Sequence, residues 1–384
     1  MKQVRLGIIG VGNIGTLHIR SLLEGKVKRV ELTAISDAKP AALQAFPAIT
    51  SFSDSRQLIR SGRVDAVLIA TPHALHTTIG IDALQQGLHV LVEKPISVHK
   101  ADCERLIAAH QNPRQIFAAM FNQRTDPFYQ KIRQLVQGGE LGEVRRINWT
   151  ITNWFRTEAY YASGGWRATW AGEGGGVLLN QCPHNLDLFQ WIFGMPQRVR
   201  AFCALGRYHH IEVEDDVTAW FEYPNGTTAV FIASTGEAPG TNRLEVAAER
   251  GRLVYENDRL ALLRNDVPMS EFSRTTSQGF AAPATSQVDL PLTGHGGQHA
   301  EVVQNFVDAI LDGQPLLAPA AEGRHSVELA NSMLFSSLTG QTVDLPLDAA
   351  AYERQLNQLI AGSKFKKTVS AGPAPAADLS ASFR

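Results

Sequence analysis

Three glycines near the start of the chain constrain its fold more than any other feature. Residues 4–15 read VRLGIIGVGNIG, an apolar run suited to a buried strand that leads into a glycine-rich turn. The residues that follow, TLHIRSLLEG, have the apolar spacing of a helix. In such a setting the first glycine allows a tight turn, the second lets a pyrophosphate approach the backbone, and the third lets the helix pack against the strand. The pattern predicts a dinucleotide held by Gly10, Gly12, Asn13, Ile14 and Gly15.

A carboxylate ends the second apolar run, VELTAISD. Asp37 follows the glycines by about twenty residues, where a carboxylate accepts the ribose hydroxyls of NAD and repels the extra phosphate of NADP. Ser36 and Lys39 could serve a phosphate, so NAD is the expected cofactor and NADP the alternative. Asp37 could instead be a turn residue before the segment AKP.

Further apolar runs alternate with helical segments over the first third of the chain. DAVLIATPHALH and GLHVLVEKP read as continuous buried strands, which is typical of a parallel, doubly wound α/β sheet. Ligands of such sheets lie beyond the carboxyl ends of the strands. The residues expected there, beside the cofactor, are Thr71, Pro72, His73, His76, Glu93 and Lys94.

Strands replace this rhythm from about residue 144. Runs such as VRRINWTITNW and DVTAWFEYP alternate, and YPNGTT is a hairpin-turn signal, so the second part is expected to be an α+β domain. Residues 299–313 and 322–339 read as closing helices. The predicted boundaries are 1–123 for the dinucleotide-binding domain, 124–362 for the α+β domain and 363–384 for a flexible tail rich in Ala, Pro and Ser.

The charge balance excludes several classes of partner. The 384 residues carry 36 basic and 37 acidic side chains, and no basic block points to nucleic acid or a membrane surface. The three scattered cysteines form neither a disulfide framework nor a zinc pattern. No apolar run reaches membrane-spanning length and the start lacks a signal peptide, so a cytoplasmic protein is expected. The run RYHHIEVEDD could suggest a metal, but we read it as a half-exposed strand with a polar rim and expect no metal site.

The motifs together resemble the Gfo/Idh/MocA family of oxidoreductases, which includes inositol dehydrogenases and glucose–fructose oxidoreductase. The matching elements, in the family's order, are GIIGVGNIG, IATPHALH, EKPIS, FNQRTDP, GELGEVRRI, GGGVLLNQCPHNLDLFQWIFG and FVDAILDG. The resemblance covers most of residues 4–340. It implies a Rossmann domain followed by an α+β domain with a large, mostly antiparallel sheet, which often carries the interface of a homodimer or homotetramer.

The resemblance also implies a catalytic site. It places the family's catalytic lysine at Lys94, which can hold the substrate oxygen and join a proton relay. The usual Asp-x-x-x-His pattern falls on Asn180 and His184, so the first member is an amide that cannot carry the proton. We therefore assign the base to His184, assistance to Lys94 and orientation of the substrate to Asn180. Asn180 as a helix N-cap and His184 as a core histidine remain alternatives.

Other residues are weaker candidates for substrate and cofactor contacts. Pro183 suits the first turn of a helix on which Asn180, His184 and Asp187 could share one face. Asn122 and Arg124 are expected near the nicotinamide. Aromatic faces and guanidinium groups suit a sugar ring, but tryptophans can equally be core and arginines surface residues. The candidate substrate residues are Lys94, Arg124, Trp154, Trp166, Arg167, Asn180, His184 and Asp187, with Arg156 and Tyr160 nearby.

The leading hypothesis is an NAD(P)-dependent dehydrogenase that acts on a ring hydroxyl of a sugar, glycoside or cyclitol. One alternative is a glycoside hydrolase that keeps NAD bound and oxidises its substrate transiently. A second is a non-catalytic, nucleotide-binding sensor, which the presence of both Lys94 and His184 disfavours.

Overall fold

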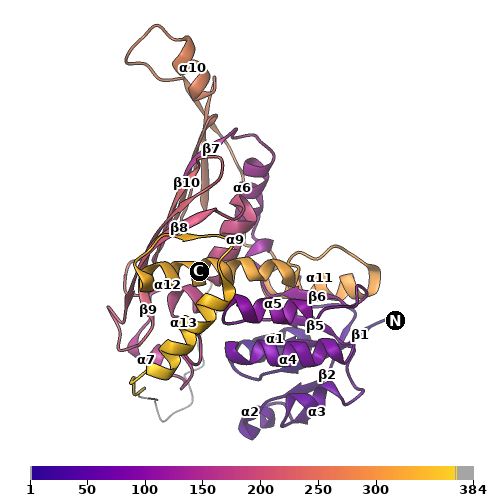
Figure 1. The fold of residues 1–384 in the computed structure, drawn as a ribbon. Helices are drawn as coiled ribbons and strands as arrows, with labels where there is room; N and C mark the ends of the chain where they lie inside the picture. The colour runs from indigo at the N-terminus through magenta and orange to yellow at the C-terminus, as the bar shows by residue number, and fades with distance from the viewer. Residues whose placement is uncertain (1, 368, 370–384) are drawn as a thin grey trace.

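The computed structural model describes residues 2–367 and 369 and divides into two domains (Figure 1). The first is built on a parallel sheet with strand order β3-β2-β1-β4-β5-β6. Its central strands consist almost wholly of buried apolar residues, and this accounts for the continuous runs in the sequence. The predicted doubly wound Rossmann sheet is confirmed. Its strands are β1 (Val4–Ile9), β2 (Val30–Ser36), β3 (Thr50–Phe52), β4 (Ala66–Ile69), β5 (His89–Val92) and β6 (Phe117–Ala119).

The helices that cover this sheet come from two separate parts of the chain. Those from the first third of the chain are α1 (Asn13–Leu23), α2 (Pro40–Gln44), α3 (Ser55–Ile59), α4 (His76–Gln85) and α5 (Lys100–Ala108), with the short 3-10 turn η1 (His73–Leu75). The other is α11 (Gln298–Asp312), which returns from the far end of the chain. Its Phe306 and Val307 are buried in one core with Leu6 and Ile8 of β1. The core of the nucleotide-binding domain thus includes α11, which lies outside the predicted boundaries of 1–123.

The second domain carries a large mixed sheet of order β14-β13-β12-β11-β7-β10-β9-β8-β15. Every pairing is antiparallel except that between β7 and β10, so the predicted, mostly antiparallel sheet is confirmed. The YPNGTT segment forms the turn between β9 and β10, with Gly226 at a φ of 86°. The strands are β7 (Val144–Ile151), β8 (Arg198–Leu205), β9 (Glu214–Glu222), β10 (Thr228–Ser234), β11 (Asn242–Ala248), β12 (Gly251–Glu256), β13 (Arg259–Asn265), β14 (Thr285–Val288) and β15 (Val343–Asp344).

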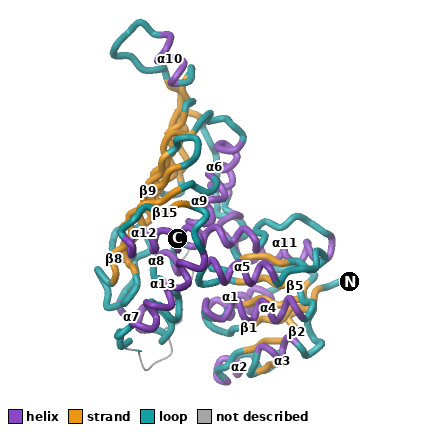
Figure 2. The backbone as a smooth tube through the Cα atoms, in the orientation of Figure 1, coloured by secondary structure: helices purple, strands orange, loops and turns teal. Residues whose placement is uncertain are grey.

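One end of this sheet extends into an arm that the sequence did not indicate. Strands β13 and β14 and the helix between them, α10 (Met269–Thr275), project beyond the rest of the molecule (Figure 2). The arm has few buried residues, and Phe280 at its end is fully exposed. β14 (TSQV) lacks the apolar run that identifies a buried strand, and only some of the apolar residues of β13 (RLALLRN) are buried.

Helices lie between the two sheets and connect them. α9 contacts both α6 and α12, and α12 also contacts β8 and α5. The predicted closing helices are thus confirmed as α11 and α12. The remaining helices of the described chain are α6 (Pro127–Gln137), α7 (Glu158–Ala162), α8 (Val177–Asn180), α9 (Pro183–Phe193), α12 (Gly323–Thr339) and α13 (Ala349–Gly362), with the 3-10 turns η2 (Asn122–Thr125) and η3 (Ala320–Glu322).

The segment RYHHIEVEDD differs from its prediction as a strand. Only its last three residues belong to β9, and the preceding part is a loop because it is folded around one carboxylate. Asp215 accepts hydrogen bonds from the backbone N–H groups of Arg207, Tyr208 and His209. Among the described residues no group of three or more His, Cys, Asp or Glu side chains is arranged to hold a metal ion. No helix in the described ranges has the length and apolar character needed to cross a bilayer.

The chain beyond α13 lies against the second domain as far as it is described. Ser363 donates to Glu212, the Phe365 ring packs near His210, and Lys367 donates to the backbone oxygen of Arg167. Most of the tail predicted at 363–384, namely residue 368 and residues 370–384, lies outside the described residues.

Candidate active site

The glycine turn after β1 has the geometry that a bound dinucleotide requires. A Cβ on Gly15 would stand 1.9 Å from the carbonyl oxygen of Gly10, so only glycine lets α1 pack this close. A Cβ on Gly12 would meet nothing within 4 Å, which leaves the N-terminus of α1 open to an incoming group. Because the first N–H groups of a helix have no partner within it, this turn fits a pyrophosphate.

Asp37 is held beside the same turn. Its Oδ2 accepts a hydrogen bond of 2.8 Å from the backbone N–H of Val11, and its Oδ1 accepts one of 2.8 Å from the backbone N–H of Lys39. The carboxylate thus joins the end of β2 to the end of β1 and remains partly exposed. A carboxylate in this position can accept ribose hydroxyls. Its bond to Lys39 shows that Asp37 also stabilises the turn before the segment AKP, which was the alternative interpretation.

The loops after β4 and β5 are joined by one histidine. The ring nitrogens of His76 lie 2.8 Å from the carbonyl oxygens of Thr71 and Pro95. Burial lowers the pKa of His76, so its neutral ring donates to one of these carbonyl oxygens, according to the tautomer, and its other nitrogen faces the second. The ring thus contacts both loops. Thr71 and the segment from Pro72 to His73 lie directly past β4, as predicted, and the ring of His73 packs edge-on against Trp166 at 5.4 Å between centroids.

Lys94 lies between two firmly held residues at the end of β5. Before it, Glu93 is buried and its Oε1 lies 2.8 Å from Nε2 of His18 on α1. After it, the Lys94–Pro95 peptide is cis, and Val98 is buried in the core of the second domain. The Nζ of Lys94 donates to the backbone oxygen of Asn180 at 3.0 Å.

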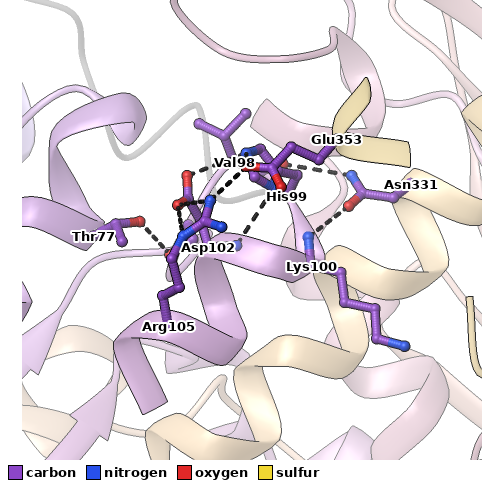
Figure 3. Close-up of polar contacts among 9 residues, drawn as sticks. Thr77, Val98, His99, Lys100, Asp102, Arg105, Asn331 and Glu353 are labelled. Atoms are coloured by element: carbon purple, nitrogen blue, oxygen red, sulfur yellow. Dashed lines mark hydrogen bonds and ion pairs between the residues drawn. The ribbon is translucent and has the colours of Figure 1, made fainter. Parts of the chain in front are cut away.

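Contacts across the domain boundary fix the segment that follows Lys94 (Figure 3). The side chain of Asn331 on α12 accepts from the N–H of Lys100 at 2.9 Å and donates to the carbonyl oxygen of Val98 at 3.4 Å. Arg105 pairs with Glu353 of α13 at 2.7 Å, as Figure 3 also shows. The Nζ of Lys100 donates to Glu328 at 2.8 Å. The second domain thus holds the loop that positions Lys94. These contacts join segments far apart in the chain, so the sequence motifs do not predict them.

The predicted helix with Asn180, His184 and Asp187 on one face is interrupted. α8 ends at Asn180 and α9 begins at Pro183, because proline has no N–H to continue the hydrogen bonding of α8 but suits the first turn of a new helix. Asn180 is not the N-cap of α9, since Cys182 occupies that position. The interruption still leaves both Asn180 and His184 beside Lys94.

The side chain of Asn180 lies in a network that the sequence only partly revealed. Its Oδ1 accepts from the hydroxyl of Tyr160 at 3.1 Å, and that hydroxyl accepts from Nη1 of Arg167 at 3.0 Å. Its Nδ2 donates to the buried carboxylate of Glu173. Glu173 was not predicted; its one signal is an acidic residue directly before three glycines. A Cβ on Gly176 would lie 1.9 Å from the carbonyl oxygen of Glu214, so this glycine allows the two backbone segments to approach closely.

His184 is a buried side chain whose two ring nitrogens have no hydrogen-bond partner among the described residues. Burial, and to a lesser degree the charge of Lys94, hold its pKa well below the usual range, so the ring is neutral at neutral pH. A neutral imidazole with a free nitrogen is able to accept a proton. Burial also lowers the pKa of Lys94, an effect that Glu93 and Glu173 oppose.

Two predicted substrate residues have a different role. Both oxygens of Asp187 accept from Arg124, at 2.7 and 2.6 Å, and both side chains are almost completely buried. They therefore pair with each other, and both oxygens of Asp187 are engaged in this pair. Arg124 also bonds Glu322 at 2.6 Å, so this pair connects η2, α9 and η3.

The remaining candidates divide between core and site. Trp154 is buried in the core of the second domain and donates to Asn185 at 3.3 Å. Trp166 is partly exposed, and the guanidinium group of Arg167 lies 4.6 Å from its ring centroid. The side chain of Asn122, past β6, is buried and donates to Gln298 at 2.6 Å, while its Oδ1 has no partner among the described residues.

The open space at Gly12 gives a prediction with a matched control. Gly12→Ala is expected to fold as the native chain does, because the new Cβ meets no atom, yet to bind dinucleotide at least about tenfold more weakly because that Cβ blocks approach to the backbone. Gly279→Ala, in the exposed loop after α10, is the control for added methyl groups, because a Cβ there also meets no atom within 4 Å and the residue does not have a positive φ. Calorimetric titration with NAD measures the difference, and equal affinity of Gly12→Ala and the native protein would place the pyrophosphate elsewhere.

Two family models match the chain. Residues 4–121 match the model described as "Oxidoreductase family, NAD-binding Rossmann fold", and residues 129–254 match "GFO/IDH/MocA C-terminal domain". The first domain is therefore an NAD-binding Rossmann domain. Similar curated proteins include inositol 2-dehydrogenase of Rhizobium meliloti (strain 1021), 23% identical over 87% of this chain and 96% of the relative. Myo-inositol 2-dehydrogenase of Thermotoga maritima is 27% identical over 67% of this chain and 76% of the relative.

Solved structures share the fold over nearly the whole chain. The WlbA dehydrogenase from Bordetella pertussis, solved with NADH and UDP-GlcNAcA, has a TM-score of 0.75 and 24% identity over 90% of this chain and 100% of its own. Levoglucosan dehydrogenase in complex with NADH and levoglucosan has a TM-score of 0.74 and 20% identity, with the same coverage. At these identities the likeness concerns the fold.

Proposed function

Because the chain belongs to the Gfo/Idh/MocA family of oxidoreductases, we propose that it oxidises a ring hydroxyl of a sugar, glycoside or cyclitol with NAD. The observation that carries the proposal is the buried and neutral His184, which has no hydrogen-bond partner in the described part of the chain and lies close to Lys94 at the carboxyl end of β5. A proton acceptor and a cation thus meet where ligands of a parallel sheet bind. The inositol 2-dehydrogenases among the relatives, and the sugar ligands named for the structural neighbours, support the substrate class.

Each group has one part in the proposed reaction. NAD, when bound, accepts the hydride from the carbinol carbon. A ring nitrogen of His184 takes the hydroxyl proton, and Nζ of Lys94 donates to the oxygen as it becomes a carbonyl. Asn180 has one Nδ2–H that its contact with Glu173 does not use, so it orients the substrate as a donor.

The aromatic and cationic residues beside Asn180 suit a polyhydroxylated ring. The guanidinium group of Arg167 lies over both Trp166 and Tyr160, at 4.6 and 4.7 Å from the ring centroids. Sugars present apolar C–H faces that pack on aromatic rings and hydroxyls that accept from guanidinium groups. We also propose a homodimer or homotetramer, which the exposed Phe202 and Trp220 on one face of the second sheet support.

The experiment is nicotinamide absorbance with NAD and NADP against inositols, aldoses, anhydrosugars and glucosides. NADH formation with one class of polyol is expected, with NAD preferred because Asp37 repels the extra phosphate of NADP. A substrate carrying deuterium on the oxidised carbon should give deuterated NADH, which identifies the carbon. Release of an aglycone without net NADH would instead support the redox-assisted hydrolase, and bound NAD without turnover of any class would contradict the dehydrogenase.

A further inference from the structure

We propose that Glu173 is a positioning residue of the proton-transfer site: its carboxylate holds the amide of Asn180 and supplies the negative charge that an amide at position 180 lacks. The inference rests on the proposed function for the reaction that it serves. It concerns a residue that neither the glycine turn nor the catalytic helix pattern includes.

The geometry that carries the proposal is a continuous line of hydrogen bonds. Arg167 donates to the Tyr160 hydroxyl at 3.0 Å, that hydroxyl donates to Oδ1 of Asn180 at 3.1 Å, and Nδ2 of Asn180 donates to Oε1 of Glu173. The other carboxylate oxygen of Glu173 accepts from the N–H of Ala168. With Oδ1 receiving the Tyr160 hydroxyl and Nδ2 facing a carboxylate, the amide of Asn180 has only one orientation, and its remaining N–H is directed by that constraint.

The charge of Glu173 acts at Lys94 as well. Glu173 is almost completely buried, and burial raises the pKa of its carboxyl. Arg167 and the hydrogen bonds from Ala168 and Asn180 oppose this rise and favour the charged form. The Nζ of Lys94 donates to the backbone oxygen of Asn180, and the side chain of Asn180 donates to Glu173. The ammonium group of Lys94 and the carboxylate of Glu173 are therefore both bonded to Asn180. Because an opposite charge favours the ammonium form, Glu173 keeps the pKa of Lys94 from falling as far as burial alone would take it.

Several other charged or titratable groups face this pair, and the test must separate Glu173 from them. Those that face Lys94 are Glu93, Glu173, Arg156, Arg167, His73, His76, His184 and His299. Those that face Glu173 are Lys94, Arg167, Lys367, Tyr161 and Glu214. Of the two carboxylates that act on Lys94, Glu93 is bonded to His18 on the side of the cofactor, whereas Glu173 lies on the side of Asn180.

The first measurement follows Lys94 itself and does not depend on turnover. Trace acetylation across a pH series, quantified by mass spectrometry on the peptide that contains Lys94, gives the midpoint at which this amine deprotonates. In Glu173→Gln the midpoint is expected to fall by about one pH unit, because the ammonium loses a nearby opposite charge. Glu237→Gln, at an exposed position of the same domain, is the matched control and should leave it unchanged. An unchanged midpoint in Glu173→Gln would overturn the proposal.

Two further variants separate charge from hydrogen bonding. Glu173→Gln/Asn180→Asp returns a carboxylate to the other end of the lost hydrogen bond and is expected to restore the Lys94 midpoint. Asn180→Leu removes the amide but keeps the carboxylate, so the midpoint should stay near the native value. Were Asn180→Leu to lower the midpoint as much as Glu173→Gln does, the charge would not be that of Glu173. If Glu173→Gln fails to fold, which a melting curve detects, the midpoints of the double variant and of Asn180→Leu are compared with the native midpoint instead, and a fall of about one pH unit in Asn180→Leu, which keeps Glu173, would overturn the proposal.

The kinetic measurement then tests the role in catalysis. Glu173→Gln is expected to lower kcat up to about 100-fold, because the misplaced Asn180 no longer orients the substrate, and to move the Lys94 limb of the pH profile of kcat/KM to lower pH. A fall in kcat with no movement of that limb would indicate a structural role only and would contradict the proposal. If the native protein oxidises no polyol, the proposed function fails, while the acetylation midpoints still decide the part played by Glu173.

Discussion

Lys94→Ala is expected to lower kcat/KM about 1,000-fold while leaving the fold and the affinity for NAD almost unchanged. In the proposed reaction, the substitution removes the cation that donates to the substrate oxygen as charge develops on it. Lys94 spends one of its three N–H donors on the backbone of Asn180 and keeps the others for that oxygen. Its neighbours Glu93 and Pro95 are fixed by other contacts, so the backbone at this position should not move.

The same assay contains its own checks. Lys26→Ala removes a surface lysine from the same domain and is expected to keep full activity. His184→Ala should lose about as much activity as Lys94→Ala, and the double variant should lose less than the product of the two losses, because both groups act on one proton transfer. Retention of more than about a tenth of the native kcat/KM by Lys94→Ala would remove it from the chemistry.

Arg124→Met is expected to lower the free energy of unfolding by about 3–5 kcal/mol. The buried carboxylate of Asp187 would lose the partner that binds both of its oxygens and keep only Gln190, at 3.1 Å. Since an uncompensated carboxylate is tolerated once it is protonated, the loss should shrink as the pH falls through the raised pKa of Asp187, which burial causes. Urea denaturation at several pH values measures both effects.

The double variant Arg124→Met/Asp187→Leu is the matched control for this pair. Replacing both charges by apolar side chains of similar size removes the buried carboxylate as well, so most of the lost stability should return. If the single and double variants are equally unstable, the loss comes from packing, or from the bond between Arg124 and Glu322.

The sequence allowed the first domain and the ends of its strands to be predicted because buried parallel strands are continuous apolar runs. Gly10, Asp37, Pro72 and Lys94 all follow such runs, and the structure places each past its strand. Asn180 and His184 could be located by their spacing around Pro183, although the proline divides the helix on which they were expected to lie.

What escaped prediction depends on contacts between distant segments. That Arg124 meets Asp187, and not a substrate, follows from the packing of η2 against α9, which no local pattern records. Glu173 could not be predicted as a site residue, because an acidic residue beside glycines is typical of an exposed turn. Only the folded chain shows that it is buried against Asn180. Asn331 holds the loop after Lys94 from more than 200 positions away in the chain, as the bond to Lys100 shows.

The return of α11 to the first sheet bears on how this enzyme could be re-engineered. A chimera that took residues 1–123 from another dehydrogenase would set a foreign β1 against Phe306 and Val307 of this chain. The ion pair between Arg29 and Asp308 of α11, at 2.6 Å, would also join the foreign segment to this chain. The exchangeable unit is therefore discontinuous and has to include α11, whereas a substitution at Asp37, which bonds the N–H of Val11, leaves the contacts between α11 and the first domain unchanged.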